Sequence, residues 1–102
     1  MAAAMVLQEC YTRTHWLIIA DLQRTIVDAE AITKKQPLPG EEMAHGRLCR
    51  STALLRERAN GYQQQYDIAI RDNDAQAMRR FLNNANAVYG GSPEYSFLSE
   101  AL

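Results

Sequence analysis

The chain has 102 residues with 11 basic and 12 acidic side chains, which leaves a formal net charge of −1 at pH 7. This balance gives no electrostatic reason to expect nucleic acid or an anionic membrane as the main partner. Two cysteines do not make a disulfide framework, and the longest apolar run, residues 16–20, is far below the roughly 20 residues that a membrane-spanning helix needs. The N-terminal segment lacks the basic stretch of a secretory signal, so we expect one small soluble domain over residues 1–102, in the cytoplasm.

The stretch KKQPLPGEE, residues 34–42, separates two long helical segments. Its prolines cannot continue a helix, its lysines suit a helix C-terminus, and its glutamates suit the start of the next helix. We predict helices over about residues 3–35 and 42–71, joined by a loop at 36–41 and packed as an antiparallel hairpin. The predicted inward stripes are Tyr11, His15, Ile18, Leu22, Thr25, Ala29 and Ile32 on the first helix, and His45, Leu48, Thr52, Leu55, Ala59, Tyr62, Tyr66 and Ala69 on the second.

Two shorter helices are predicted after the hairpin. Asp72, Asn73 or Asp74 can cap a third helix over about 74–89, and the glycines that follow it stop that helix. Ser92 and the proline after it suit the start of a short helix over about 93–101. The predicted apolar face of the third helix is Met78, Phe81, Leu82, Ala85, Val88 and Tyr89. Since no strand pattern is found, the predicted fold is all-α: a small helical bundle in which a hairpin of two long helices is completed by two shorter C-terminal ones.

The first helix carries a second apolar set behind its inward stripe, made of Val6, Cys10, Trp16, Leu17, Ala20, Val27 and Ala31 and interrupted by Arg13 and Arg24. A helix that is apolar on two sides needs cover on both, and the second helix can cover only one. We therefore expect a partner, either a second copy in a homodimer or another protein. The predicted interaction residues are Val6, Arg13, Trp16, Leu17, Ala20, Arg24 and Val27.

The histidines and cysteines fall in two pairs, Cys10 with His15 and His45 with Cys49. In an antiparallel hairpin His45 faces the region of residue 31, whereas the first pair lies near the far end of the second helix. The four side chains cannot converge within one hairpin, and their spacing is not that of a structural zinc site. We expect no metal, no cofactor and no disulfide between Cys10 and Cys49, and we interpret all four residues as packing residues.

No arrangement of nucleophile, base and orienting group typical of an enzyme is found, so we predict that the protein is not an enzyme. The favoured hypothesis is a non-catalytic protein-binding module, a small adaptor, chaperone or inhibitor that uses the second apolar face of its first helix. Small secretion-system chaperones, bacteriophage accessory proteins and immunity proteins share this description. The alternative is a dimeric helical nucleic-acid-binding protein in which Arg47, Arg50 and Arg58 contact phosphates.

Overall fold

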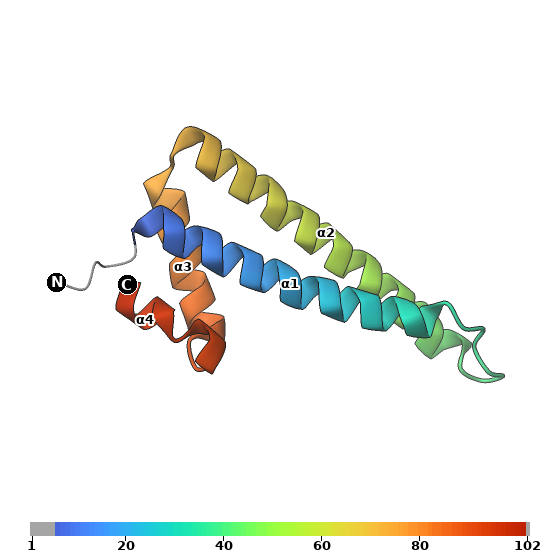
Figure 1. Ribbon diagram of the computed structural model, residues 1–102. Coiled ribbons are helices and arrows are strands. Elements are labelled where there is room, and N and C mark those ends of the chain that lie inside the picture. Colours follow the sequence, from blue (N-terminus) through green and yellow to red (C-terminus); the bar gives the residue numbers. More distant parts are fainter. Residues whose placement is uncertain (1–5, 102) are drawn as a thin grey trace. The chain divides into compact units, whose positions relative to one another are not determined.

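The computed structural model describes residues 6–101, which form α1 (Leu7–Thr33), α2 (Glu42–Asp72), α3 (Ala75–Tyr89), the short 3₁₀ helix η1 (Pro93–Tyr95) and α4 (Phe97–Ala101) (Figure 1). No strand occurs within this range. The all-α prediction, with two long helices followed by two shorter ones, is confirmed. Positions 3–5 of the predicted first helix lie outside the described residues. None of the helices described is long and apolar enough to cross a membrane.

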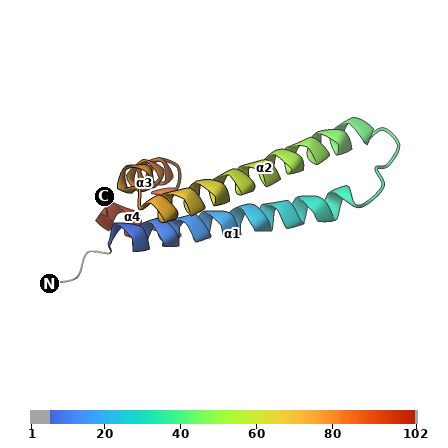
Figure 2. The ribbon, with the colours of Figure 1, turned by 90° about the horizontal axis from the view of Figure 1, so that it is seen from above.

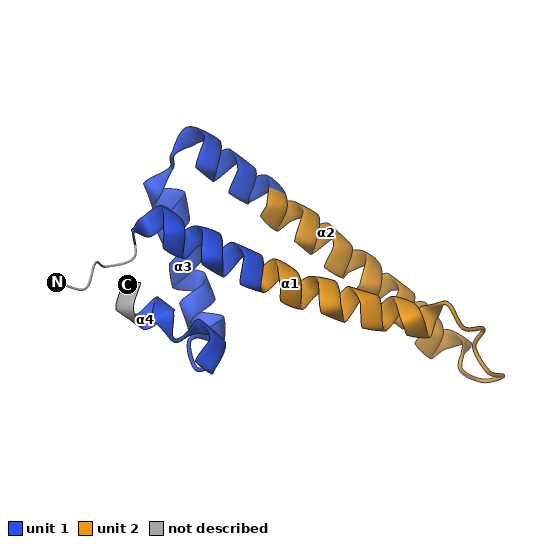
Figure 3. Ribbon diagram, viewed as in Figure 1, with its two compact units in different colours: residues 1–17, 64–102 blue, residues 18–63 orange. Residues whose placement is uncertain are grey.

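Contacts divide the described chain into two compact units (Figure 3). Unit 1 contains residues 6–17 and 64–101, so it holds the first part of α1, the last part of α2 and all of α3 and α4. Unit 2 contains residues 18–63, which are the rest of the two long helices and the loop between them. The single domain predicted over 1–102 stays a prediction.

Unit 2 is an antiparallel helical hairpin whose two segments lie side by side in Figures 1 and 2. Its buried residues are Ile18, Ile19, Ile26, Ala29 and Thr52. An ion pair links the helices, since Nε of Arg56 on α2 donates to Oε1 of Glu30 on α1 over 3.1 Å. Two members of the predicted inward stripe are exposed instead: Thr25, and Ile32 at 58%. The hairpin has only two layers, so side chains near the edge of the shared face stay in contact with water.

Unit 1 is built around an aromatic core. The ring of Tyr11 stacks on Tyr66 of α2 at 5.4 Å and meets Phe81 of α3 edge-on at 5.2 Å. Met78, Leu82 and Ala85 on α3 are buried together with Tyr95, Phe97 and Leu98 of the C-terminal segment. Val88 is 72% exposed, which corrects its predicted place on the apolar face of α3. Residue 88 lies about 120° around the helix from Leu82, past the edge of the buried side.

The turn between α2 and α3 uses asparagine where a glycine is usual. Asn73 has a φ of 49°, in the left-handed region that asparagine tolerates better than most residues. The amides of Asn73 and Asp74 donate to the carbonyls of Ile70 and Ala69, the paired bonds that close a helix C-terminus. The Asp74 side chain then accepts from the Ala77 amide at 3.1 Å, so among the three predicted caps the structure selects Asp74.

Candidate functional site

Four of the seven predicted interaction residues belong to unit 1. Val6 and Trp16 are 58% and 49% exposed, Arg13 is exposed, and Leu17 is half-buried. The carbonyl of Val6 accepts a hydrogen bond from the Cys10 amide at 3.0 Å, so the first turn of α1 holds this residue in place. Two large apolar side chains are therefore exposed to solvent, Val6 directly before α1 and Trp16 on it.

The Trp16 indole is oriented by two aromatic neighbours. The His15 ring meets it edge-on at 4.8 Å, and the Tyr66 ring does so at 5.9 Å. His15 is in turn stacked on Tyr66 at 4.2 Å, and the Tyr66 hydroxyl lies 3.0 Å from the hydroxyl oxygen of Thr12. These contacts limit the rotation of the indole while about half of its surface stays accessible. An exposed aromatic ring with few remaining rotamers loses little entropy when a partner covers it.

Arg13 has a role inside unit 1 that the sequence pattern does not show. Its guanidinium carbon lies 4.1 Å from the centre of the Phe97 ring on α4, at cation–π distance. This contact links α1 to the C-terminal segment. Arg13 therefore contributes to internal packing as well as to the outward surface, and its substitution would not test partner binding alone.

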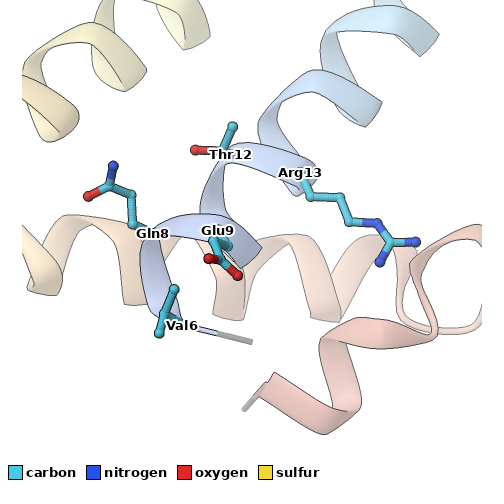
Figure 4. A pocket seen from close by; sticks show the side chains of 5 residues that line it. All are labelled: Val6, Gln8, Glu9, Thr12 and Arg13. Carbon is cyan, nitrogen blue, oxygen red and sulfur yellow. The ribbon is translucent and has the colours of Figure 1, made fainter. Parts of the chain in front are cut away.

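A shallow cavity of about 470 Å³ lies against the first two turns of α1 (Figure 4). It is lined by Val6, Gln8, Glu9, Thr12 and Arg13. One aliphatic side chain is thus surrounded by polar and charged groups. Polar groups beside an exposed aliphatic side chain are also found at the rim of protein interfaces.

The other three predicted interaction residues, Ala20, Arg24 and Val27, belong to unit 2 and are exposed. Val27 is 64% exposed. Arg24 forms an ion pair with Asp21 one turn earlier on the same helix. The hairpin of unit 2 covers one side of each helix, so these residues on the opposite side of α1 remain outside its core.

The alternative arginines are also exposed and also lie in unit 2. Arg47, Arg50 and Arg58 follow one side of α2 at steps of three and eight residues, with the exposed Leu54 between them. Glu57 is exposed one position before Arg58. The positive field along this side of the helix is therefore diluted by an acidic group and interrupted by an aliphatic one.

The two cysteine–histidine pairs are in different units. Cys10 and His15 are buried in unit 1, as expected for packing residues. His45 is half-buried in unit 2, and Cys49 is exposed, so the prediction that Cys49 is a packing residue is wrong. Both thiols are free. Over the described part of the chain, no group of three or more His, Cys, Asp or Glu side chains could hold a metal ion.

Unit 2 contains a second cavity, of about 600 Å³, at the loop end of the hairpin. Its lining is mostly apolar and consists of Ile32, Lys35, Gln36, Pro37, Leu38, Glu41, Ala44, His45 and Leu48. No pattern in the sequence predicts this cavity. The prolines of the loop signalled a turn, but the way in which the loop folds beside the helix ends depends on tertiary packing.

Comparison of the chain with protein-family models, with curated proteins and with solved structures found no match.

Proposed function

We propose that the protein is a non-catalytic protein-binding module whose outward α1 residues bury against a helical partner, either a second copy of the chain or another protein. The observation that carries this proposal is the exposure of the apolar residues Val6, Trp16 and Val27 on the solvent side of α1. Single exposed apolar residues are common on protein surfaces, but here three lie on or just before one helix, Val6 and Trp16 in unit 1 and Val27 in unit 2.

Trp16 is the proposed anchor. Tryptophan is enriched among residues that dominate binding energy, and this indole is already oriented by His15 and Tyr66. Leu17 and Val27 add aliphatic area, while polar groups such as Glu9 and Arg13 border Val6 in the first cavity. Apolar anchors within a polar rim are the usual composition of a protein interface.

We expect the double substitution Trp16→Ala plus Leu17→Ala to weaken association at least about tenfold, because losing even one anchor commonly costs more than about 1.4 kcal/mol. The measurement is the solution mass by light scattering after size exclusion over a range of protein concentrations. Leu54→Ala removes an exposed aliphatic side chain from α2 and serves as the control, expected to leave the mass unchanged.

Leu17 is half-buried, so the double variant must first show an unchanged circular dichroism spectrum. Val27→Asp gives a second test that leaves the buried core intact, because this side chain is largely exposed. If both variants stay folded and retain the mass and the partner capture of the parent chain, α1 is not the binding surface.

The alternative proposal, nucleic-acid binding through Arg47, Arg50 and Arg58, is supported by their shared exposure on α2. Retention on a nucleic-acid column that falls steeply with salt would favour it, since phosphate contacts release counterions. Retention that is absent at low salt would leave the protein-binding proposal as the stronger one.

A further inference from the structure

The side chains of His45 and Cys49 on α2 are arranged in a way that packing alone does not require. Nδ1 of His45 lies 3.8 Å from Sγ of Cys49, within reach of a sulfur hydrogen bond. Nε2 of the same ring lies 3.0 Å from the carbonyl oxygen of Thr33 at the end of α1. All three groups belong to unit 2, and the thiol itself is exposed.

The Thr33 carbonyl determines which imidazole nitrogen faces the thiol. A carbonyl oxygen can only accept a hydrogen bond, so Nε2 of the neutral ring carries the proton and donates it to Thr33. Nδ1 is then the unprotonated nitrogen, and it points at the Cys49 thiol. Nucleophile, base and orienting group therefore stand in the order that is typical of an activated nucleophile.

We propose that Cys49 is a base-assisted thiol that exchanges with small-molecule disulfides. In this step Nδ1 of His45 takes the thiol proton while Sγ of Cys49 attacks one sulfur of the disulfide. A new sulfur–sulfur bond forms as the original one breaks, and the other half of the reagent leaves as a thiolate. Cys49 is oxidised to a mixed disulfide, and the departing half of the reagent is reduced.

Cys10 serves as an internal reference thiol that we expect to be unreactive toward disulfides in the folded protein. That thiol is fully buried in unit 1, and burial raises its pKa, although a hydrogen bond with Thr14 and the charge of Arg13 act in the opposite direction. A raised pKa and a lack of access both suppress the thiolate that attacks. We therefore expect one rapidly exchanging thiol per folded chain, and peptide mapping should assign it to Cys49.

The test uses dipyridyl disulfide, a neutral reagent whose released thiopyridone is followed by absorbance. His45→Gln should lower the second-order rate constant of the fast thiol roughly 10–100-fold, at or below the range usual for a positioned general base, because the sulfur–nitrogen separation is long. Arg50→Gln is the matched control, since it removes a neighbouring positive charge without removing the base. It should change the rate by less than about threefold.

Equal losses in the two variants would show that charge, not proton transfer, sets the rate, and would overturn the proposal. A His45→Gln rate within about twofold of the parent would do the same. If that variant unfolds, Cys10 also becomes reactive and a second equivalent of thiopyridone reveals it. In that case the test is made on the unsubstituted protein. Its Cys49 should react faster than N-acetylcysteine amide under identical conditions, and an equal or slower rate contradicts the proposal.

Discussion

Cys10 and Cys49 show how far one residue type can diverge in one small chain. Both are predicted from the sequence to be packing residues, but Cys10 is fully buried and Cys49 is exposed beside His45. Burial of Cys10 depends on unit 1, where α3 and α4 add layers around the start of α1. Periodicity along a single helix identifies which residues share a side, but it does not say which elements arrive to cover that side.

Substitution of a helical glycine by alanine should stabilise the protein. Gly61 lies inside α2, and a methyl group added there would meet no atom within 4 Å. Gly61→Ala should raise the free energy of unfolding by about 1 kcal/mol, because alanine has the higher helix propensity and restricts the unfolded chain. Thermal denaturation should show a midpoint about 4–8 °C higher.

Gly40→Ala is the matched control for Gly61→Ala. Gly40 also has open space around it, but its φ of 90° is a backbone conformation that residues with a Cβ rarely adopt. This variant should lower the midpoint. A rise at both positions would show that unfolded-state entropy alone governs the effect, whereas a fall at Gly61 would reveal a packing constraint on α2.

For the helices, local capping and turn residues determine where α2 ends and where α3 begins. The α2–α3 turn closes α2 through Asn73 in the left-handed region and opens α3 through the Asp74 cap. The predicted end of α2, residue 71, is one residue from the observed end at Asp72, because caps and breakers act locally. The sequence left three candidates for the cap of α3, and the structure chose between them through the backbone bonds of the turn.

Removing the Asp74 cap should loosen α3. Asp74→Ala leaves the Ala77 amide without its side-chain acceptor and should cost about 1 kcal/mol of unfolding free energy, measured by urea denaturation. Asp74→Asn keeps an oxygen acceptor without the charge, and we expect it to retain most of the stability. If alanine and asparagine cost the same, the charge near the helix N-terminus, not the hydrogen bond, is the larger contribution.

At the scale of the whole molecule, the two units differ in how they bury side chains. Unit 1 brings together four α-helical segments and the 3₁₀ helix η1, and it buries Tyr11, Leu82 and Leu98 almost completely. Unit 2 has two segments and buries a narrower strip. The same helix α1 therefore contributes to a layered core in one unit and to a two-helix hairpin in the other, and Val27, on the open side of the hairpin, keeps most of its surface exposed.

The core of unit 1 should make the protein sensitive to alkaline pH. Burial, and secondarily the neighbouring Tyr66, raise the pKa of Tyr11, and burial raises that of Cys10. The folded state thus keeps protons that the unfolded state releases above its ordinary values of about 8.5 for cysteine and 10 for tyrosine. The stabilisation is complete below those values and is lost as pH rises from them to the raised pKa values of the folded state.

Urea denaturation at a series of pH values should therefore show a free energy of unfolding that decreases above about pH 8.5. Tyr11→Phe should make that decrease shallower, because it removes a group whose pKa is raised in the folded state. An unchanged slope in Tyr11→Phe would assign the alkaline sensitivity to other groups.

The all-α class, the order of two long and two short helices, and the loop at Pro37 and Pro39 follow from the sequence, because periodicity, capping and helix breaking are local properties. The burial of Cys10, the contact of Arg13 with Phe97, the exposure of Ile32 and Val88, and the orientation of His45 between the Thr33 carbonyl and Cys49 follow from tertiary packing. Each of these depends on residues distant in the sequence that meet only after the helices pack. The proposed α1 surface combines both kinds of information: sequence periodicity identifies its residues, and the packing of each unit leaves Val6, Trp16 and Val27 exposed.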